Sequence, residues 1–308
     1  MKKKLLLLFS LVLTSSLVFF ISYSKGEVQL GESEQAIEET TIPQMVKSAD
    51  LSKIFTFAGE RIPTEDFDVL QRLDNELTLN IYRHGVTLLN IKKAARFFPV
   101  IEQIFKERGI PDDLKYIAVA ESDLQNATSP AGAKGFWQIM PAVAEEYGLE
   151  VNDEVDERFH LEKSTVAAAK LLQNYKNYFG SWSLAVAAYN GGIGRIKNAL
   201  QEQRGVSFYD LNVNQETSRY LFRVIAIKEI ISNPRKFGYY LNEDDLYPVW
   251  NDYYMLQVDS NIENLADFAR KNGISYRQLK AYNPWLIATR LTNPKRKVYE
   301  IKIPYLDK

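Results

Sequence analysis

Apolar residues in the first two-thirds of the chain recur with the period of a helix. Leu70, Leu73, Leu77 and Ile81 stand three or four positions apart, as on the buried face of an amphipathic helix. Similar patterns predict helices around 101–105, 114–121, 141–147, 165–178, 182–189 and 217–231. We expect Pro99 near the first turn of one helix and Asp112 as the cap of another. No convincing strand precedes about residue 250, so residues 51–240 are predicted to form an all-α domain.

The pattern changes near residue 250. Residues 253–258 and 298–303 have the character of strands, and residues 265–269 and 276–281 that of short helices. This order predicts a small α+β module of strand, helix, helix and strand over residues 250–306. The predicted fold class is therefore mainly α, a helical domain followed by a βααβ module.

The N-terminus carries an export signal. Lys2, Lys3 and Lys4 precede an apolar run from Leu5 to about Ile21, and Ser22-Tyr23-Ser24 follows, with small serines at the positions that a signal peptidase reads. Residues 1–24 are therefore predicted to be a signal peptide. The run is near the lower limit for spanning a bilayer, so an uncleaved membrane anchor stays open. Residues 25–50 are acidic and lack apolar periodicity, which predicts a flexible linker. We expect the rest of the chain in the periplasm or cell envelope.

Composition removes several classes of function. A formal charge of −1 over 308 residues gives no strong field for nucleic acid. The absence of cysteine excludes disulfides and thiolate chemistry, and the two histidines are far apart, so we predict no metal and no cofactor. The 18 Tyr, 16 Phe and 4 Trp are compatible with a glycan binder, although most are expected in the core. Oligomeric state is not readable from the sequence.

Glu121 is the first candidate for chemistry. It closes an apolar helix, where the helix dipole and apolar neighbours both disfavour the charged carboxylate and raise its pKa. A raised pKa suits a general acid that works near neutral pH. Taken alone, the same residue also fits a glutamate that points to solvent.

Two clusters follow downstream. Residues 135–141 deliver Trp137 and Gln138 just before a helix, and residues 188–192 end a helix with Tyr189, Asn190 and two glycines. Gln138 could bond a sugar hydroxyl or amide, and Tyr189 with Asn190 could bond an acetamido group. Taken alone, each cluster is more typical of a structural role. A tryptophan such as Trp137 usually belongs to the core, and Asn followed by Gly usually ends a helix.

Together with Gln215–Tyr220, these motifs resemble the soluble-lytic-transglycosylase-like domain of family 1, related to goose-type lysozymes. The resemblance covers roughly residues 90–235, and its last motif looks most like the membrane-bound D group. It implies a lysozyme-like fold and cleavage of the β-1,4 bond between N-acetylmuramic acid and N-acetylglucosamine, with peptidoglycan glycan strands as the partner. The resemblance implies that Glu121 is the catalytic acid/base and that Ser122 contacts substrate or orients this glutamate. It also implies that Tyr220 donates a hydrogen bond to the catalytic carboxylate. The substrate-binding residues that it implies are Gln138, Tyr189 and Asn190.

Two residues of the last motif, Glu216 and Arg219, are interpreted as structural. His160 stands where the family often carries Asp. We interpret it as a capping or packing variation, remote from the motifs.

A single carboxylate raises the question of the nucleophile, since ordinary glycosidases use two. The resemblance implies that the muramic acid's own 6-hydroxyl attacks, leaving a 1,6-anhydro sugar while Glu121 acts first as acid and then as base. Two alternatives stay open. One is a hydrolytic muramidase that uses the same glutamate and a water, and the other is a non-catalytic peptidoglycan-binding scaffold.

Residues 253–304 resemble a divergent LysM module. The matching features are Leu265, Gly273, Leu279, Asn283 and the closing strand, whereas residues 259–261 replace the usual Gly-Asp turn. The resemblance implies glycan binding. The alternative is a packing module that buttresses the catalytic domain.

Overall fold

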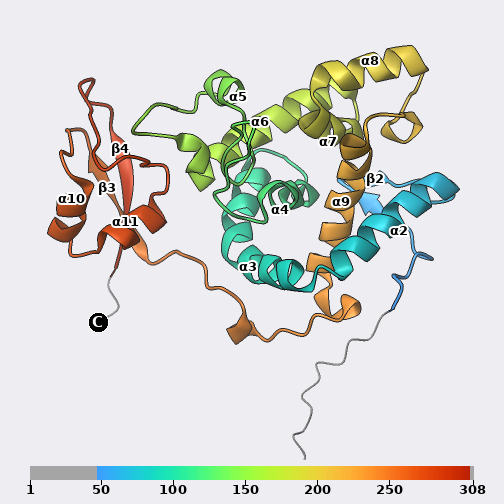
Figure 1. The fold of residues 1–308 in the computed structure, drawn as a ribbon, viewed down its shortest axis with the longest axis horizontal. Coiled ribbons are helices and arrows are strands. Elements are labelled where there is room, and N and C mark those ends of the chain that lie inside the picture. The colour runs from blue at the N-terminus through green and yellow to red at the C-terminus, as the bar shows by residue number, and fades with distance from the viewer. Residues whose placement is uncertain (1–46, 306–308) are drawn as a thin grey trace, which may run out of the picture. The chain divides into compact units, whose positions relative to one another are not determined.

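The computed structural model describes residues 47–305 (Figure 1). The predicted export segment and almost all of the acidic linker lie outside the described residues. Between residues 47 and 305, no helix combines the length and the apolar character needed to cross a membrane.

Helices dominate the described chain up to residue 250, as predicted. Helix α9 runs along the middle of this region and packs against α2, α4 and α7, while α6 packs against α3 and α7. The α-helices are α2 (Phe67–Ile81), α3 (His84–Glu107), α4 (Tyr116–Ser122), α5 (Pro141–Glu146), α6 (Leu161–Phe179), α7 (Trp182–Gly191), α8 (Ile193–Gln203) and α9 (Gln215–Ser232). Short 3-10 helices are η1 (Asp112–Lys115), η2 (Glu157–Phe159), η3 (Phe208–Asp210), η4 (Pro234–Phe237) and η5 (Glu243–Asp245).

The expectation of no strand before residue 250 was wrong. Strands β1 (Thr56–Phe57) and β2 (Glu60–Arg61) form an antiparallel hairpin. Its turn residues, Ala58 and Gly59, both have positive φ, at 51° and 78°, as the tightest hairpin turns require. Strands of two residues are too short for the alternation of apolar and polar positions to become visible.

Two local predictions also failed. Pro99 lies in the interior of α3 rather than near a helix start. A proline there loses one backbone hydrogen bond, but the buried face of α3 runs on from Ile91 through Phe98 to Phe105 and holds the helix together. Asp112 opens η1 instead of capping α4, and its carboxylate pairs with Lys115 at 2.5 Å. Helix α8 was not anticipated.

The C-terminal module has the predicted order of strand, helix, helix and strand. Strand β3 (Tyr253–Val258) is followed by α10 (Leu265–Lys271), α11 (Tyr276–Tyr282) and β4 (Tyr299–Pro304). The two strands pair antiparallel, from Tyr253 opposite Pro304 to Val258 opposite Tyr299. The module has its own apolar core, and Val155, from the segment before η2, is buried in it. Residues of the helical region therefore complete the packing of the module.

Candidate active site

Glu121 is held in the last turn of α4. The preceding residues of this helix, from Tyr116 to Val119, are buried in the helical core. The helix stops at Ser122 because Asp123 and Leu124 adopt φ values of 51° and 52°, in the left-handed region. A short helix fixed by its apolar side thus presents one carboxylate at its end.

The Glu121 carboxylate accepts a hydrogen bond of 2.5 Å from the hydroxyl of Tyr220, a buried residue of α9. Burial raises the pKa of Glu121 to about 7. The Tyr220 bond and the charge of Arg223 act against this rise, and the charge of Glu216 adds to it. Near neutral pH the group can therefore both give and take a proton.

Both tyrosines beside Glu121 remain protonated. Burial, followed by the nearby charge of Glu121, raises the pKa of Tyr220 and of Tyr189 well above the usual value. Tyr220 is consequently a proton-bearing donor to the carboxylate across the working pH range. The common influence of Glu121 on both phenols shows that α4, α7 and α9 converge on this carboxylate.

The loop that carries Gln138 is fixed by a close backbone approach. Gly135 has φ of +82°, and a Cβ atom there would lie 2.0 Å from the carbonyl oxygen of Arg158, so only glycine fits. The buried Arg158 side chain donates to the carbonyls of Gly132, at 3.0 Å, and Ile139, at 3.3 Å. This dense loop is therefore a rigid element and more than a connection.

Gln138 is held in an unusual conformation within that loop. Its φ is 47°, a value that residues other than glycine adopt at a cost. Its side-chain amide donates to the carbonyls of Gly135, at 2.8 Å, and Ala127, at 3.2 Å. The neighbouring Trp137 is a core residue, as expected from its type, and its indole donates to Thr165 at 2.9 Å.

The third cluster is tied to the second and to α9. Tyr189 donates its hydroxyl proton to the carbonyl of Trp137 at 2.6 Å, and the side-chain oxygen of Asn190 accepts from Thr217 at 2.9 Å. Gly191 makes this approach possible, because a Cβ there would meet the Thr217 side chain at 2.9 Å. Three segments that are far apart in sequence are therefore brought to one place.

Ser122 faces inward. It is buried, and its hydroxyl lies 2.9 Å from both the Ala118 and the Phe136 carbonyl oxygens, to one of which it donates at a time. The side chain thereby links the end of α4 to the loop of Gln138. Asp123 is turned to α3, where its carboxylate accepts from Asn90 at 2.7 Å.

Two charged residues that influence Glu121 were not predicted to belong to the site. Glu216 and Arg223 both influence the pKa of Glu121, and they pair with each other at 3.2 Å. With Tyr220 they stand four and three residues apart on one face of α9. That helical spacing was the available signal. In residues 47–305, no group of three or more acidic or histidine side chains could hold a metal ion.

Comparison with known families gives two matches. A model of the transglycosylase SLT domain matches residues 99–212. A model of the soluble lytic transglycosylase C-terminal LysM-like domain matches residues 254–306, which are the βααβ module.

Among curated proteins, the chain is similar to membrane-bound lytic murein transglycosylase D of Escherichia coli strain K12. Identity is 32% over 240 residues, which cover 75% of this chain and 51% of the relative. The chain thus spans about half the length of this curated relative.

Two solved structures also align. A lytic transglycosylase Slt inactive mutant from Pseudomonas aeruginosa is 22% identical, with a TM-score of 0.38 over 49% of this chain and 26% of that one. The 70 kDa soluble lytic transglycosylase Slt70 from Escherichia coli is 23% identical, with a TM-score of 0.39 over 44% of this chain and 24% of that one.

Proposed function

We propose that this chain is a peptidoglycan lytic transglycosylase. It belongs to the transglycosylase SLT family through residues 99–212, and it carries the C-terminal LysM-like domain of soluble lytic transglycosylases at residues 254–306. It cleaves the β-1,4 bond between N-acetylmuramic acid and N-acetylglucosamine. The name of its E. coli relative supports this activity, and the setting of Glu121 supports the chemistry.

In the first step, protonated Glu121 gives its proton to the glycosidic oxygen. The bond between that oxygen and the anomeric carbon of N-acetylmuramic acid breaks, and N-acetylglucosamine leaves with a free 4-hydroxyl. The oxygen of the muramic acid 6-hydroxyl then bonds to the anomeric carbon, and its proton passes to the Glu121 carboxylate. The product is a 1,6-anhydro sugar, no water is consumed, and Glu121 regains its proton.

The observation that carries this proposal is the pairing of Glu121 with Tyr220. Because the pKa of Glu121 is raised to about 7, acid and base forms are of similar abundance at neutral pH, as one residue with two roles requires. An intramolecular nucleophile also gains the advantage of proximity. The carboxylate nearest to Glu121 in the sequence, that of Asp123, accepts a hydrogen bond from Asn90. We therefore assign no catalytic role to Asp123.

The other site residues have supporting roles in this proposal. Tyr220 orients the carboxylate through its 2.5 Å hydrogen bond. Gln138, Tyr189 and Asn190 bind the sugar and its acetamido group, and Ser122 orients the end of α4 through the loop carbonyl of Phe136.

The experiment is digestion of isolated cell walls by wild type and by Glu121→Gln, with mass analysis of the released muropeptides. We expect wild-type ends one water lighter than reducing ends, and none from the variant. Reducing ends alone would identify a hydrolytic muramidase instead. Equal release by both proteins would remove Glu121 from catalysis, and release by neither would favour a non-catalytic scaffold.

We place the enzyme in the cell envelope, exported by the signal at residues 1–24 and working in the periplasm, with the membrane association of its E. coli relative as support. The predicted division is a catalytic domain at 51–240 and a LysM-like module at 250–306 that adds affinity for glycan strands. Retention of wild type, but not of a chain truncated after residue 250, on purified peptidoglycan would support this role for the module.

A further inference from the structure

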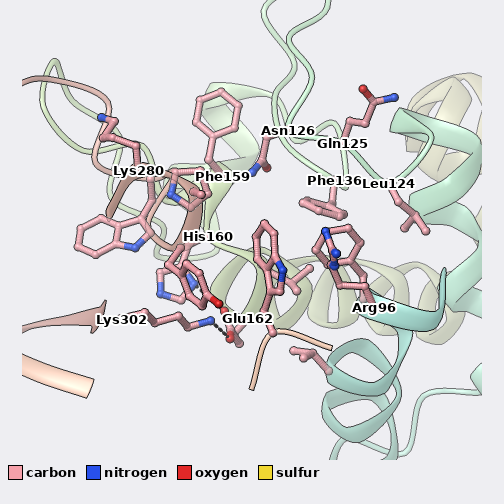
Figure 2. A pocket seen from close by; sticks show the side chains of 18 of the residues that line it. Arg96, Leu124, Gln125, Asn126, Phe136, Phe159, His160, Glu162, Lys280 and Lys302 are labelled. Carbon is pink, nitrogen blue, oxygen red and sulfur yellow. Dashed lines mark hydrogen bonds and ion pairs between the residues drawn. The ribbon is translucent and has the colours of Figure 1, made fainter. Parts of the chain in front are cut away.

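A cavity of about 350 Å³ lies where the C-terminal module meets the helical domain (Figure 2). One wall comes from α3 and from the segment that follows α4. The other comes from η2, the start of α6, α11 and β4. Figure 2 shows Arg96, Leu124 and Phe136 on the opposite side of the view from Lys280 and Phe159. A volume of this size admits a ligand as large as a sugar or a short peptide.

Aromatic rings line the cavity on both sides. On one side Phe97 packs against Phe136, with ring centroids 4.8 Å apart. Trp250 stacks on Tyr282, the last residue of α11, at 5.1 Å. On the other side His160 stacks on Trp285 at 5.7 Å. Rings in such positions suit the apolar faces of sugars and the side chains of peptides.

His160 packs against Trp285 of the C-terminal module. It precedes α6, but its side chain makes no capping hydrogen bond, so the capping half of the earlier interpretation was wrong. The imidazole instead joins the helical domain to the module.

The charges in the cavity do not balance. Glu162 forms an ion pair with Lys302, which offsets its charge, and its other oxygen lies 3.1 Å from His160. Arg96 lies over the ring of Trp250, at 4.5 Å, and Lys280 donates to the carbonyl of Ala288 at 3.1 Å. Within residues 47–305, neither Arg96 nor Lys280 forms an ion pair with a carboxylate. Burial lowers the pKa of Lys280, which is the mark of a cation partly removed from water without a compensating anion.

The cavity is also close to the catalytic residue in sequence and in structure. Leu124, three residues after Glu121, lines it, and so does Phe136, whose carbonyl lies 2.9 Å from the Ser122 hydroxyl. A substrate strand held at Glu121 therefore has this cavity within its neighbourhood.

We propose that this cavity is a binding site for a carboxylate-bearing part of the peptidoglycan substrate. Arg96 and Lys280, on opposite sides of the cavity, each offer a cation to a carboxylate, and the aromatic walls receive the apolar part of the ligand. The identity of the ligand rests on the proposed function. Two parts of the polymer have this chemistry: the peptide stem with its free carboxylates, and the lactyl carboxylate of muramic acid on a strand without peptide.

The test is calorimetric titration of the full chain carrying Glu121→Gln, which prevents turnover. Four probes are used: a disaccharide-tetrapeptide, the free tetrapeptide, the peptide-free disaccharide and an uncharged N-acetylglucosamine oligomer. Each is titrated into this protein, into the same protein with Lys280→Glu or Lys280→Arg, and into a matched control with Arg277→Glu. Arg277 is an exposed cation on the same helix that does not line the cavity.

We expect Lys280→Glu to weaken the binding of at least one carboxylate-bearing probe about tenfold or more, with Lys280→Arg and Arg277→Glu close to the parent. Which probes respond identifies the source: the tetrapeptide for the peptide stem, or the peptide-free disaccharide for the lactyl group. An unchanged affinity for every carboxylate-bearing probe in Lys280→Glu, or an equal loss for the uncharged oligomer, would overturn the proposal.

Failure of this proposal is distinguishable from failure of the proposed function. If wild-type protein releases anhydro-muropeptides from cell walls while the Lys280→Glu variant binds every probe normally, the proposed function stands and the cavity proposal is overturned. If binding depends on Lys280 but the wild-type protein releases no anhydro product, the cavity proposal stands and the proposed function is overturned.

Discussion

Glu121 and Glu162 are both glutamates withdrawn from water, yet their pKa values move in opposite directions. Burial is the first influence on each, and it raises the pKa of a carboxyl group. At Glu121 the value rises to about 7, whereas at Glu162 it falls to about 2. The difference lies in the partners. Glu121 has one neutral donor, Tyr220, and Glu162 has Lys302 and His160.

This comparison separates a carboxyl group whose pKa suits the acid and base roles proposed for it from one that forms an ion pair between two parts of the chain. A single neutral hydrogen bond does not offset the cost of burying charge, so the protonated and ionised forms of Glu121 are of similar abundance near pH 7. At Glu162 the Lys302 ammonium, together with the His160 ring 3.1 Å away, more than offsets it, so Glu162 stays ionised and joins the helical domain to the module. The residue type and the degree of burial alone would not tell the two apart.

The largest expected effect is on catalysis at Glu121. Substitution Glu121→Gln replaces the carboxyl group by an amide that can neither give nor take the proton. It should lower the rate of anhydro-muropeptide release about 1000-fold or more, because in the proposed mechanism one residue supplies both acid and base. The measurement is product release from cell walls at pH 7. Glu145→Gln, an exposed glutamate of α5, is the matched control and should retain wild-type activity.

The next effect is on stability against pH. Because the folded-state pKa of Glu121 is raised from 4.5 to about 7, the folded protein holds this proton more tightly than the unfolded chain. Its contribution is fully present below about pH 4.5 and is lost as pH rises through about 7. Relative to wild type, Glu121→Gln should gain up to about 3 kcal/mol in free energy of unfolding from pH 4 to pH 8. Urea unfolding across that range measures it, and a constant difference between the two proteins would contradict the assigned shift.

Glu162 should show the opposite sign. Its folded-state pKa is lowered to about 2, so its contribution is present above about pH 4.5 and is lost as pH falls through about 2. Glu162→Gln leaves Lys302 without its partner and should lower the free energy of unfolding at pH 7 by about 2 kcal/mol. Glu300→Gln, an exposed glutamate of β4 two residues before Lys302, is the control. Equal stability of the two variants would show that the ion pair holds nothing together.

The smallest effect tests the neutral partner of Glu121. Tyr220→Phe keeps the packing and removes a hydrogen bond that lowers the pKa of the carboxyl group. We expect the rate at the pH optimum to fall about tenfold and the alkaline limb of the pH–rate profile to move to higher pH. A fall in rate with an unmoved limb would mean that Tyr220 acts on the substrate and not on Glu121. Tyr178→Phe, an exposed tyrosine, controls for loss of a phenol.

Much of the fold was predictable, and its failures have physical causes. Long amphipathic helices such as α2 and α9 reveal themselves through repeated apolar spacing, as does the order of the βααβ module. The β1–β2 hairpin is too short to show a pattern, and α3 runs through Pro99 because its buried face outweighs one lost hydrogen bond. Of the site, Glu121 and Tyr220 were predicted as a bonded pair, whereas Glu216 and Arg223 were not predicted to influence it.

The sequence by itself marked the candidate residues for chemistry and the order of the helices, because motif residues and helical periodicity are local properties of the chain. Only the tertiary structure decided their environment. It placed the hydroxyl of Tyr220 2.5 Å from Glu121 across 99 positions of sequence, and it turned Ser122 inward. It also brought Arg96 and Lys280 to one cavity. The pKa of a carboxyl group depends on neighbours that sequence distance does not reveal, and for that reason the roles of Glu121 and Glu162 differ only in the folded chain.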